Sequence, residues 1–339
     1  MQPNYGIQRG GEKGLMQGPQ VSTDKSWDAI LEAFIMNLDA KQNTKRQYKK
    51  CLSIFYKWCQ TQNIQLGTIS RADILKYKQQ LMSDEKSLST QTVAVYLVAI
   101  RRLFDWLEAE KFYPNIAKGV KSPRIKKEFV KQHLTKEECV DILNKLYDDV
   151  EGKVRKKAYA NHEENGLRDY ALVNLLLRTG LRTIELARLD VGDVTIKRRK
   201  RVIVVWGKGR DSKDDYVPLS EKAYQPLADY LSTRPNASPD DPLFACAGYG
   251  SHGRRMSARR IQTICKDALR GIGLNDHEFS AHSFRHTCAV ALIQAGASAY
   301  DVQKFLRHSS IDTTEIYLKS IEEELRLGKS PENMLDHAF

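Results

Sequence analysis

The feature that most constrains the fold is a basic segment, residues 116–133, that divides the chain into two blocks. It holds six Lys or Arg residues against one Glu, grouped around Ser122-Pro123. This composition cannot form a core, but it suits a linker that lies along a phosphate backbone. A solvated linker without a binding role fits the same residues. Either way, the 339 residues are expected to fold as two domains with separate cores.

The block before the linker, residues 24–115, has the apolar spacing of amphipathic helices. Trp27, Ile30 and Phe34 recur at three- and four-residue steps, and similar spacing continues to Phe112. We therefore expect an all-helical domain. Cations on these helices could meet DNA or form an ordinary solvent face. The DNA-binding candidates in this block and in the linker are Lys45, Arg46, Lys49, Lys50, Arg101, Arg102, Lys121, Arg124, Lys126 and Lys127.

The block after the linker, residues 134–320, mixes helix and strand signals. Thr135 and Glu138 form a capping-box pattern that opens a helix. Residues 169–178 are typical of a buried helix that ends at Gly180. Residues 202–206 and 216–219 are typical of strands, and further helices are expected near 220–231, 257–270, 283–295, 299–306 and 312–324. The chain is thus predicted to be mainly α (α+β), with a small antiparallel β-sheet in the second domain.

Composition argues against membrane and disulfide-rich classes. No apolar run approaches the ~18 residues that suggest a membrane span, and residues 1–23 are polar and glycine-rich. We expect a disordered N-terminal extension and a cytoplasmic protein. No CxxC pair is present, so we expect reduced, mostly buried thiols. The six cysteines are Cys51, Cys59, Cys139, Cys246, Cys265 and Cys288.

Common cofactor motifs are absent or incomplete. Residues 248–253 match GxGxxG, but no convincing strand precedes them and no βαβ unit surrounds them. Gly207-Lys208-Gly209 lacks the rest of a phosphate-binding P-loop, and neither HExxH nor a carboxylate cluster suggests a metal site. The sequence therefore predicts no cofactor and no metal ion.

Two groups of polar residues in the second block have spacings that suit anion chemistry. Arg182 follows the buried helix that ends at Gly180, and Glu185 stands three residues later, where its carboxylate could aim the guanidinium. His282 and Arg285 are three apart at a helix start, so both project from the same face and can address one anion together.

Three further residues complete the candidate set. Lys208 lies between glycines at the tip of a predicted hairpin, where a long cationic side chain can swing toward a phosphate. His308 and Tyr317 are nine positions apart across a turn at 309–312, which lets two short helices bring both side chains to one site.

These residues stand in motifs that resemble the tyrosine recombinase, or phage-integrase, family, which includes chromosome-dimer resolvases and mobile-element integrases. The resemblance spans nearly the whole chain. One departure is Arg307, which stands where many members carry glycine. The motifs are Thr179-Gly180-Leu181-Arg182, Gly207-Lys208-Gly209, His282-Ser283-Phe284-Arg285, Leu306-Arg307-His308 and Thr313-Thr314-Glu315-Ile316-Tyr317.

Phosphodiester chemistry explains why such residues belong together. Breaking this anion without a metal requires cations around the phosphorane, which two arginines and hydrogen-bonding histidines provide. A phosphotyrosine link conserves the bond energy, so resealing needs no ATP. The resemblance implies that Tyr317 is the nucleophile, Lys208 the general acid and His282 a group that assists the tyrosine's proton. Arg182, Arg285 and His308 complete the catalytic set, with Glu185 in support.

The resemblance also implies an assembly. The helical domain and the catalytic domain clamp a duplex, and four protomers exchange strands through a Holliday junction. The acidic tail, residues 321–339, has apolar residues at helical steps that suit docking on a neighbouring protomer, or alternatively folding on its own domain. The extension 1–23 favours a mobile-element integrase over a housekeeping resolvase. The rival functions are type IB topoisomerase-like relaxation and an inactive DNA-binding protein.

Overall fold

The computed structural model describes residues 27–83, 88–124, 133–155, 162–206, 212–248, 250–274 and 278–307. The chain divides into two compact units, Met1–Lys127 and Glu128–Phe339. Each unit has its own hydrophobic core. The predicted class, mainly α with a small antiparallel sheet, is confirmed.

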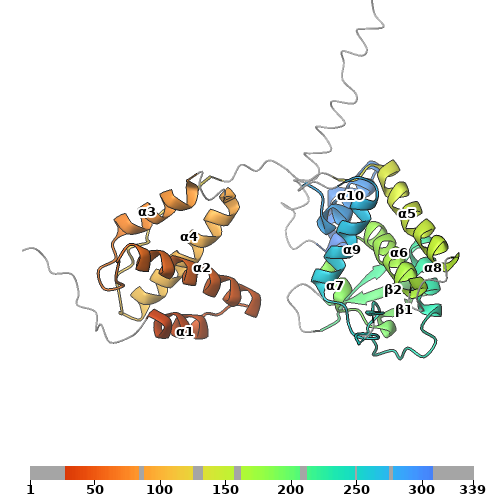
Figure 1. The fold of residues 1–339 in the computed structure, drawn as a ribbon, viewed down its shortest axis with the longest axis horizontal. Coiled ribbons are helices and arrows are strands. Elements are labelled where there is room, and N and C mark those ends of the chain that lie inside the picture. Colours follow the sequence, from red (N-terminus) through yellow and green to blue (C-terminus); the bar gives the residue numbers. More distant parts are fainter. Residues whose placement is uncertain are drawn as a thin grey trace, which may run out of the picture. The chain divides into compact units, whose positions relative to one another are not determined.

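The regular secondary structure of the first unit's described residues consists of helices alone, as the apolar spacing predicts. One face of each helix is buried, so that Phe34, Phe55, Tyr77 and Leu103 meet in a single core. Ser70 and Asp73 form a capping box that starts the third helix. The helices are α1 (Trp27–Asn37), α2 (Gln42–Thr61), α3 (Arg71–Met82) and α4 (Thr90–Ala109) (Figure 1).

The start of the basic segment 116–133 differs from the linker expected from its composition. Ala117 and Val120 are buried in the core of the first unit. The guanidinium of Arg101 donates to the Val120 carbonyl at 2.7 Å and to the Ser122 hydroxyl at 3.0 Å. The Arg71 guanidinium donates to the Lys118 carbonyl, and the Lys78 ammonium donates to the Lys121 carbonyl at 2.8 Å. Two apolar residues and three cations thus pack this stretch onto the first unit. Its continuation over residues 125–132 lies outside the described residues.

The second unit is built around α6, which has α5, α8 and α10 as neighbours (Figure 1). Its first helix opens with the predicted capping box: the Thr135 amide donates to the Glu138 carboxylate at 2.8 Å, and the Glu138 amide to the Thr135 hydroxyl at 3.1 Å. The helices are α5 (Lys136–Arg155), α6 (His162–Thr179), α7 (Thr183–Ala187), α8 (Glu221–Ser232), α9 (Ala258–Gly271), α10 (Ala281–Gln294) and α11 (Ala299–Leu306).

A three-stranded antiparallel sheet completes the second unit, with strand order β1-β2-β3. Ile203 pairs with Val194 on one side and with Val217 on the other, and this face turns toward the core. The sequence predicted the second and third strands but missed the first, which is too short to show a periodicity. The strands are β1 (Val194–Lys197), β2 (Lys200–Val205) and β3 (Asp215–Pro218).

All six cysteines are free thiols, as predicted, and four of them are buried. Burial raises the pKa of the Cys288 thiol to about 12 and that of Cys139 to about 11, so neither is a thiolate at neutral pH. No helix within the described ranges is long and apolar enough to cross a membrane. The expected N-terminal extension, the helix near 312–324 and the tail 321–339 lie outside the described residues.

Candidate active site

The site begins where α6 ends. Gly180 has a φ of +58°, a left-handed conformation that glycine adopts without cost. A Cβ at this position would also clash with the Leu306 side chain and lie 3.3 Å from the Cys288 sulfur. The glycine therefore lets the end of α6 pack directly against α10 and α11. This close approach brings three segments that are distant in the sequence to one place.

Arg182 and Glu185 form the first part of the site. The Glu185 carboxylate accepts from the Arg182 backbone amide at 2.7 Å, which caps α7, and from the Arg182 guanidinium at 2.7 Å. The second terminal nitrogen of Arg182 donates to the Arg307 carbonyl at 3.1 Å. The Arg182 side chain keeps 24% of its surface exposed. A fixed guanidinium with remaining access to solvent can still bind an anion.

Arg285, near the start of α10, is buried, and its side chain reaches the same place. Its two terminal nitrogens donate to the carbonyls of Gly180 and Leu306. These two carbonyls belong to the turn after α6 and to the end of α11. Arg285 thus ties together the segment that carries Arg182 and the segment that leads to His308.

Arg307 ends α11 in the left-handed conformation, with a φ of +56°. This is the position where the sequence departs from glycine. Its side chain is only 9% exposed and its guanidinium donates to the Glu185 carboxylate at 2.8 Å. Its Nε lies 4.0 Å from the Asp215 carboxylate at the start of β3. Glu185 is thereby shared by two arginines, and the pair of cations outweighs the one carboxylate.

The two arginines change the acidity of Glu185. Burial alone would raise the pKa of this carboxyl, but the Arg307 charge and the bonds from Arg182 outweigh burial and hold the pKa below its ordinary value. Glu185 is therefore ionised at neutral pH. Because it stays charged, it acts as a fixed acceptor that orients both guanidinium groups, and it is poorly suited to donate a proton.

The remaining predicted residues fall into two groups. His282 lies in the first turn of α10 beside Arg285, but its side chain is exposed, whereas Arg285 is buried. The His282 and His286 rings are in edge contact, with centroids 6.4 Å apart. Lys208, His308 and Tyr317 lie outside the described residues. Arg307, which the structure joins to Arg182, directly precedes His308.

A second ionic cluster, which the sequence did not reveal, lies at the base of the β2–β3 connection. The Lys213 ammonium donates to Asp190 at 2.6 Å and to Asp193 at 2.7 Å, and Arg255 also binds Asp190. These bonds raise the pKa of Lys213 and lower that of Asp190, although burial opposes both shifts. The cluster anchors the chain just after the segment that holds Lys208. Within the described ranges, no group of His, Cys, Asp and Glu could hold a metal ion.

The cations predicted to meet DNA in the first unit have different environments. Arg46, Lys50 and Arg102 are exposed. The Lys49 ammonium lies 4.0 Å from Glu32, and the Lys45 ammonium donates to the Met36 carbonyl at 3.4 Å. Arg101 is half-buried and holds the Val120 carbonyl, so its role is at least partly structural. Lys121 and Arg124 are described, whereas Lys126 and Lys127 are not.

Comparison with known proteins places this chain in a family. Residues 134–324 match the phage integrase family, and residues 31–111 match the phage integrase N-terminal SAM-like domain. The tyrosine recombinase XerC of Actinobacillus pleuropneumoniae serotype 7 is 31% identical over 236 residues, which cover 69% of this chain and 70% of the relative. The XerC of Corynebacterium glutamicum is 38% identical over 167 residues, 49% of this chain and 51% of the relative.

Solved structures share the fold. A XerH site-specific recombinase bound to a palindromic difH substrate has a TM-score of 0.68 at 21% identity, over 90% of this chain and 84% of the other. The Tn1549 transposon integrase in complex with transposon right end DNA has a TM-score of 0.58 at 19% identity, over 88% and 98%. The chain therefore belongs to the phage integrase family and is a tyrosine recombinase, an enzyme that cuts and rejoins DNA strands.

Proposed function

We propose that this enzyme cleaves double-stranded DNA at specific sites through Tyr317, forms a covalent 3′-phosphotyrosine intermediate and passes through a Holliday junction to integrate or excise a mobile element. The observation that carries the proposal is the meeting of Arg182, Arg285 and the end of α11. Arg182 binds the Arg307 carbonyl, and Arg285 binds the Leu306 carbonyl. Both arginines are thus held within a few residues of His308.

The chemistry follows from charge. A phosphodiester gains negative charge on its non-bridging oxygens when a tyrosine attacks, and two preorganised guanidinium groups stabilise that charge. Arg182 is fixed by Glu185 and Arg285 by two backbone carbonyls, so neither has to reorganise during the reaction. The site needs no ATP because the phosphotyrosine bond is reversed by the attack of a DNA 5′ hydroxyl.

The other roles are assigned to the remaining residues of the candidate set. Tyr317 is the nucleophile, Lys208 protonates the departing 5′ hydroxyl, and His282 assists the removal of the tyrosine proton. His308 contributes a hydrogen bond to the phosphate. The Lys213 anchor supports this assignment of Lys208, because it fixes the chain five residues after the general acid.

The partner is double-stranded DNA, and the enzyme works as a tetramer on two duplexes. The domains are a core-binding unit at 24–115, a basic linker at 116–133 and a catalytic unit at 134–320. Exposed Arg46, Lys50 and Arg102 contact the phosphate backbone from the first unit. A cytoplasmic location and the choice of a mobile element over a chromosome-dimer site remain predictions from the sequence.

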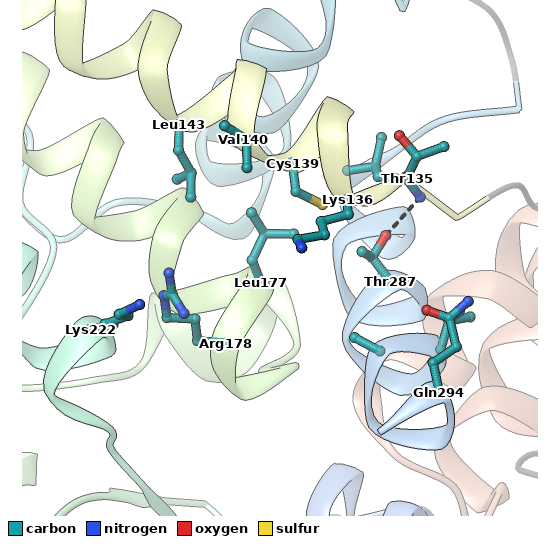
Figure 2. A pocket seen from close by; sticks show the side chains of 13 residues that line it. Thr135, Lys136, Cys139, Val140, Leu143, Leu177, Arg178, Lys222, Thr287 and Gln294 are labelled. Atoms are coloured by element: carbon teal, nitrogen blue, oxygen red, sulfur yellow. Dashed lines mark hydrogen bonds between the residues drawn. The ribbon is translucent and has the colours of Figure 1, made fainter. Parts of the chain in front are cut away.

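A pocket in the second unit supports docking of the acidic tail, residues 321–339. A cavity of about 420 Å³ opens between α5, α6 and α10, with Cys139, Leu143 and Leu177 in its apolar lining (Figure 2). Its remaining lining residues include the cations Lys136, Arg178 and Lys222. The tail carries a net charge of −3 and apolar residues at helical steps, which complement the cations and the apolar side chains of this lining. We place the tail of a neighbouring protomer there.

The decisive experiment traps the covalent intermediate. The full chain is incubated with nicked suicide substrates carrying its recombination site, found by mapping the DNA ends that the protein holds covalently in cells. We expect a protein–DNA adduct with wild type and none with Tyr317→Phe. The proposal fails if the two proteins behave alike.

Two further measurements test a rival function and the role of the tail. Relaxation of any supercoiled plasmid, irrespective of sequence, would identify a type IB topoisomerase activity. Deletion of residues 321–339 is expected to reduce assembly on DNA or to change cleavage, and unaltered behaviour in both assays would remove the tail from the mechanism.

A further inference from the structure

The turn between β1 and β2 is basic at every position. Lys197, Arg198, Arg199, Lys200 and Arg201 follow one another, and all five are exposed. The strands are joined by only two residues, Arg198 and Arg199, because Lys197 pairs with Lys200 across the hairpin. No other part of the described chain has five successive cations.

The backbone conformation of this turn is unfavourable for arginine. Arg198 has a φ of +48° and Arg199 a φ of +64°. Two-residue hairpin turns of type I′ need positive φ at both positions, which is why Asn-Gly is the preferred sequence. A side chain with a Cβ is strained there, since the left-handed region crowds Cβ against the backbone. Two arginines are therefore a costly choice for closing this hairpin.

Electrostatics add to that cost. Lys197 and Lys200 stand directly opposite each other, and like charges in a cross-strand pair are destabilising. The neighbours at the edges of the cluster have partners: the Lys197 ammonium lies 5.2 Å from the centre of the Tyr216 ring, and Arg201 binds Glu221 at 2.6 Å. The ion pairs of the described residues include none to Arg198, Arg199 or Lys200. No ion pair within the described chain therefore neutralises the three cations at the tip.

We propose that the β1–β2 turn is a DNA backbone-binding element, in which Arg198, Arg199 and Lys200 contact phosphates outside the cleavage site. This inference rests on the proposed function, because it takes DNA to be the ligand of the second unit. A polyanion removes the mutual repulsion of the cations and gains from the release of counterions. Conformational strain is typically retained where it serves a function.

The position in the sheet separates this element from the chemistry. β2 runs from Lys200 at the turn to Val205, and Lys208 follows three residues later in the sequence. A strand of this length spans roughly 20 Å. The tip thus lies a strand length away from Val205, the end of β2 that is nearer in sequence to the candidate general acid, so we expect it to contribute affinity and not bond cleavage.

A double substitution tests the inference in two assays, because it should lower the affinity for DNA without lowering the melting temperature. Arg198→Asn with Arg199→Gly gives the preferred type I′ sequence and removes two charges. Binding of the full chain to a random-sequence duplex of about 30 base pairs should weaken roughly 5- to 50-fold, with a shallower salt dependence by up to about 2 in log–log slope. The melting temperature should stay the same or rise by about 2 °C.

Two control variants keep the result interpretable. Lys145→Gln with Lys266→Gln removes the same charge from exposed positions on α5 and α9 and should weaken binding far less. Arg198→Lys with Arg199→Lys retains the charge and should bind close to wild type. The inference is overturned if the Asn-Gly variant binds DNA like the Lys145/Lys266 control.

Other outcomes separate DNA binding by the turn from binding of a protein segment and from failure of the proposed function. If the Asn-Gly variant keeps its DNA affinity but changes its oligomeric state, the turn binds an acidic protein segment, and the DNA proposal is wrong. If wild type itself neither binds duplex DNA nor forms the covalent adduct, the proposed function fails. Wild-type binding together with an unaffected Asn-Gly variant refutes only the role of the turn.

Discussion

The end of α11 and the β1–β2 turn both hold arginine in the same unfavourable backbone conformation. They differ in whether the charge of that arginine is paired within the protein. Arg307 has a φ of +56°, close to the values of +48° and +64° at Arg198 and Arg199. Arg307 is largely buried and binds Glu185, whereas the turn arginines are exposed and lack an ion-pair partner among the described residues. The strain at Arg307 is offset inside the protein. The strain in the turn points to a ligand outside it.

The largest effect is expected from the carboxylate that the two site arginines share. Glu185→Gln keeps the volume but removes the charge, and it leaves the largely buried Arg307 without its counter-ion. Breaking a buried ion pair in this way costs about 3–5 kcal/mol of unfolding free energy. Denaturant unfolding measures it. Glu221→Gln, which breaks an exposed pair with Arg201, is the matched control and should cost less than about 1 kcal/mol. Equal losses of unfolding free energy in the two variants would mean that the ion pair at the end of α11 is no more important than an exposed one.

The same carboxylate makes stability depend on pH. The pKa of Glu185 is lower in the folded protein than its ordinary value of 4.5, so the folded state gains stability above that value. This gain is lost as the pH falls through the lower, folded pKa. Wild type should therefore lose more stability than Glu185→Gln between about pH 5 and pH 3 in denaturant titrations. Parallel losses in both proteins would show that other carboxyl groups dominate.

Substitution of Arg307 by glycine combines two opposing effects. Glycine relieves the left-handed strain but removes a cation from Glu185, which keeps its bonds to Arg182. We expect a net loss of about 1–2 kcal/mol and slower cleavage, because Glu185 is held less firmly. Arg307→Ala keeps the strain and should be less stable than Arg307→Gly by about 1 kcal/mol. A glycine variant as stable as wild type would mean that the ion pair contributes nothing.

The smallest effect has the opposite sign. Arg199→Gly relieves the same strain but removes no internal ion pair, so it should stabilise the protein by about 0.5–1 kcal/mol. Thermal melts of Arg199→Gly and Arg307→Gly, measured side by side, give the sharpest test. If both substitutions shift stability in the same direction, the two regions do not differ in the way proposed here.

Local sequence signals predicted most of the secondary structure because they act over a few residues. Thr135 and Glu138 form the expected capping box, and Gly180 ends α6 as expected. The first strand, Val194–Lys197, escaped prediction because four residues are too few to display an alternating pattern. The packing of Val120 onto the first unit also escaped, since the charged residues around it suggested an open linker.

The sequence by itself determined the helical periodicity and the motifs around Arg182 and Arg285. It also showed that Arg307 stands where many family members carry glycine. Only the tertiary structure decided how they combine. It brings Arg307 to Glu185 across 122 positions and Arg285 to Gly180 across 105. It also leaves the arginines of the β1–β2 turn exposed. These long-range contacts and exposures depend on how the whole core packs, and no short-range sequence pattern encodes them.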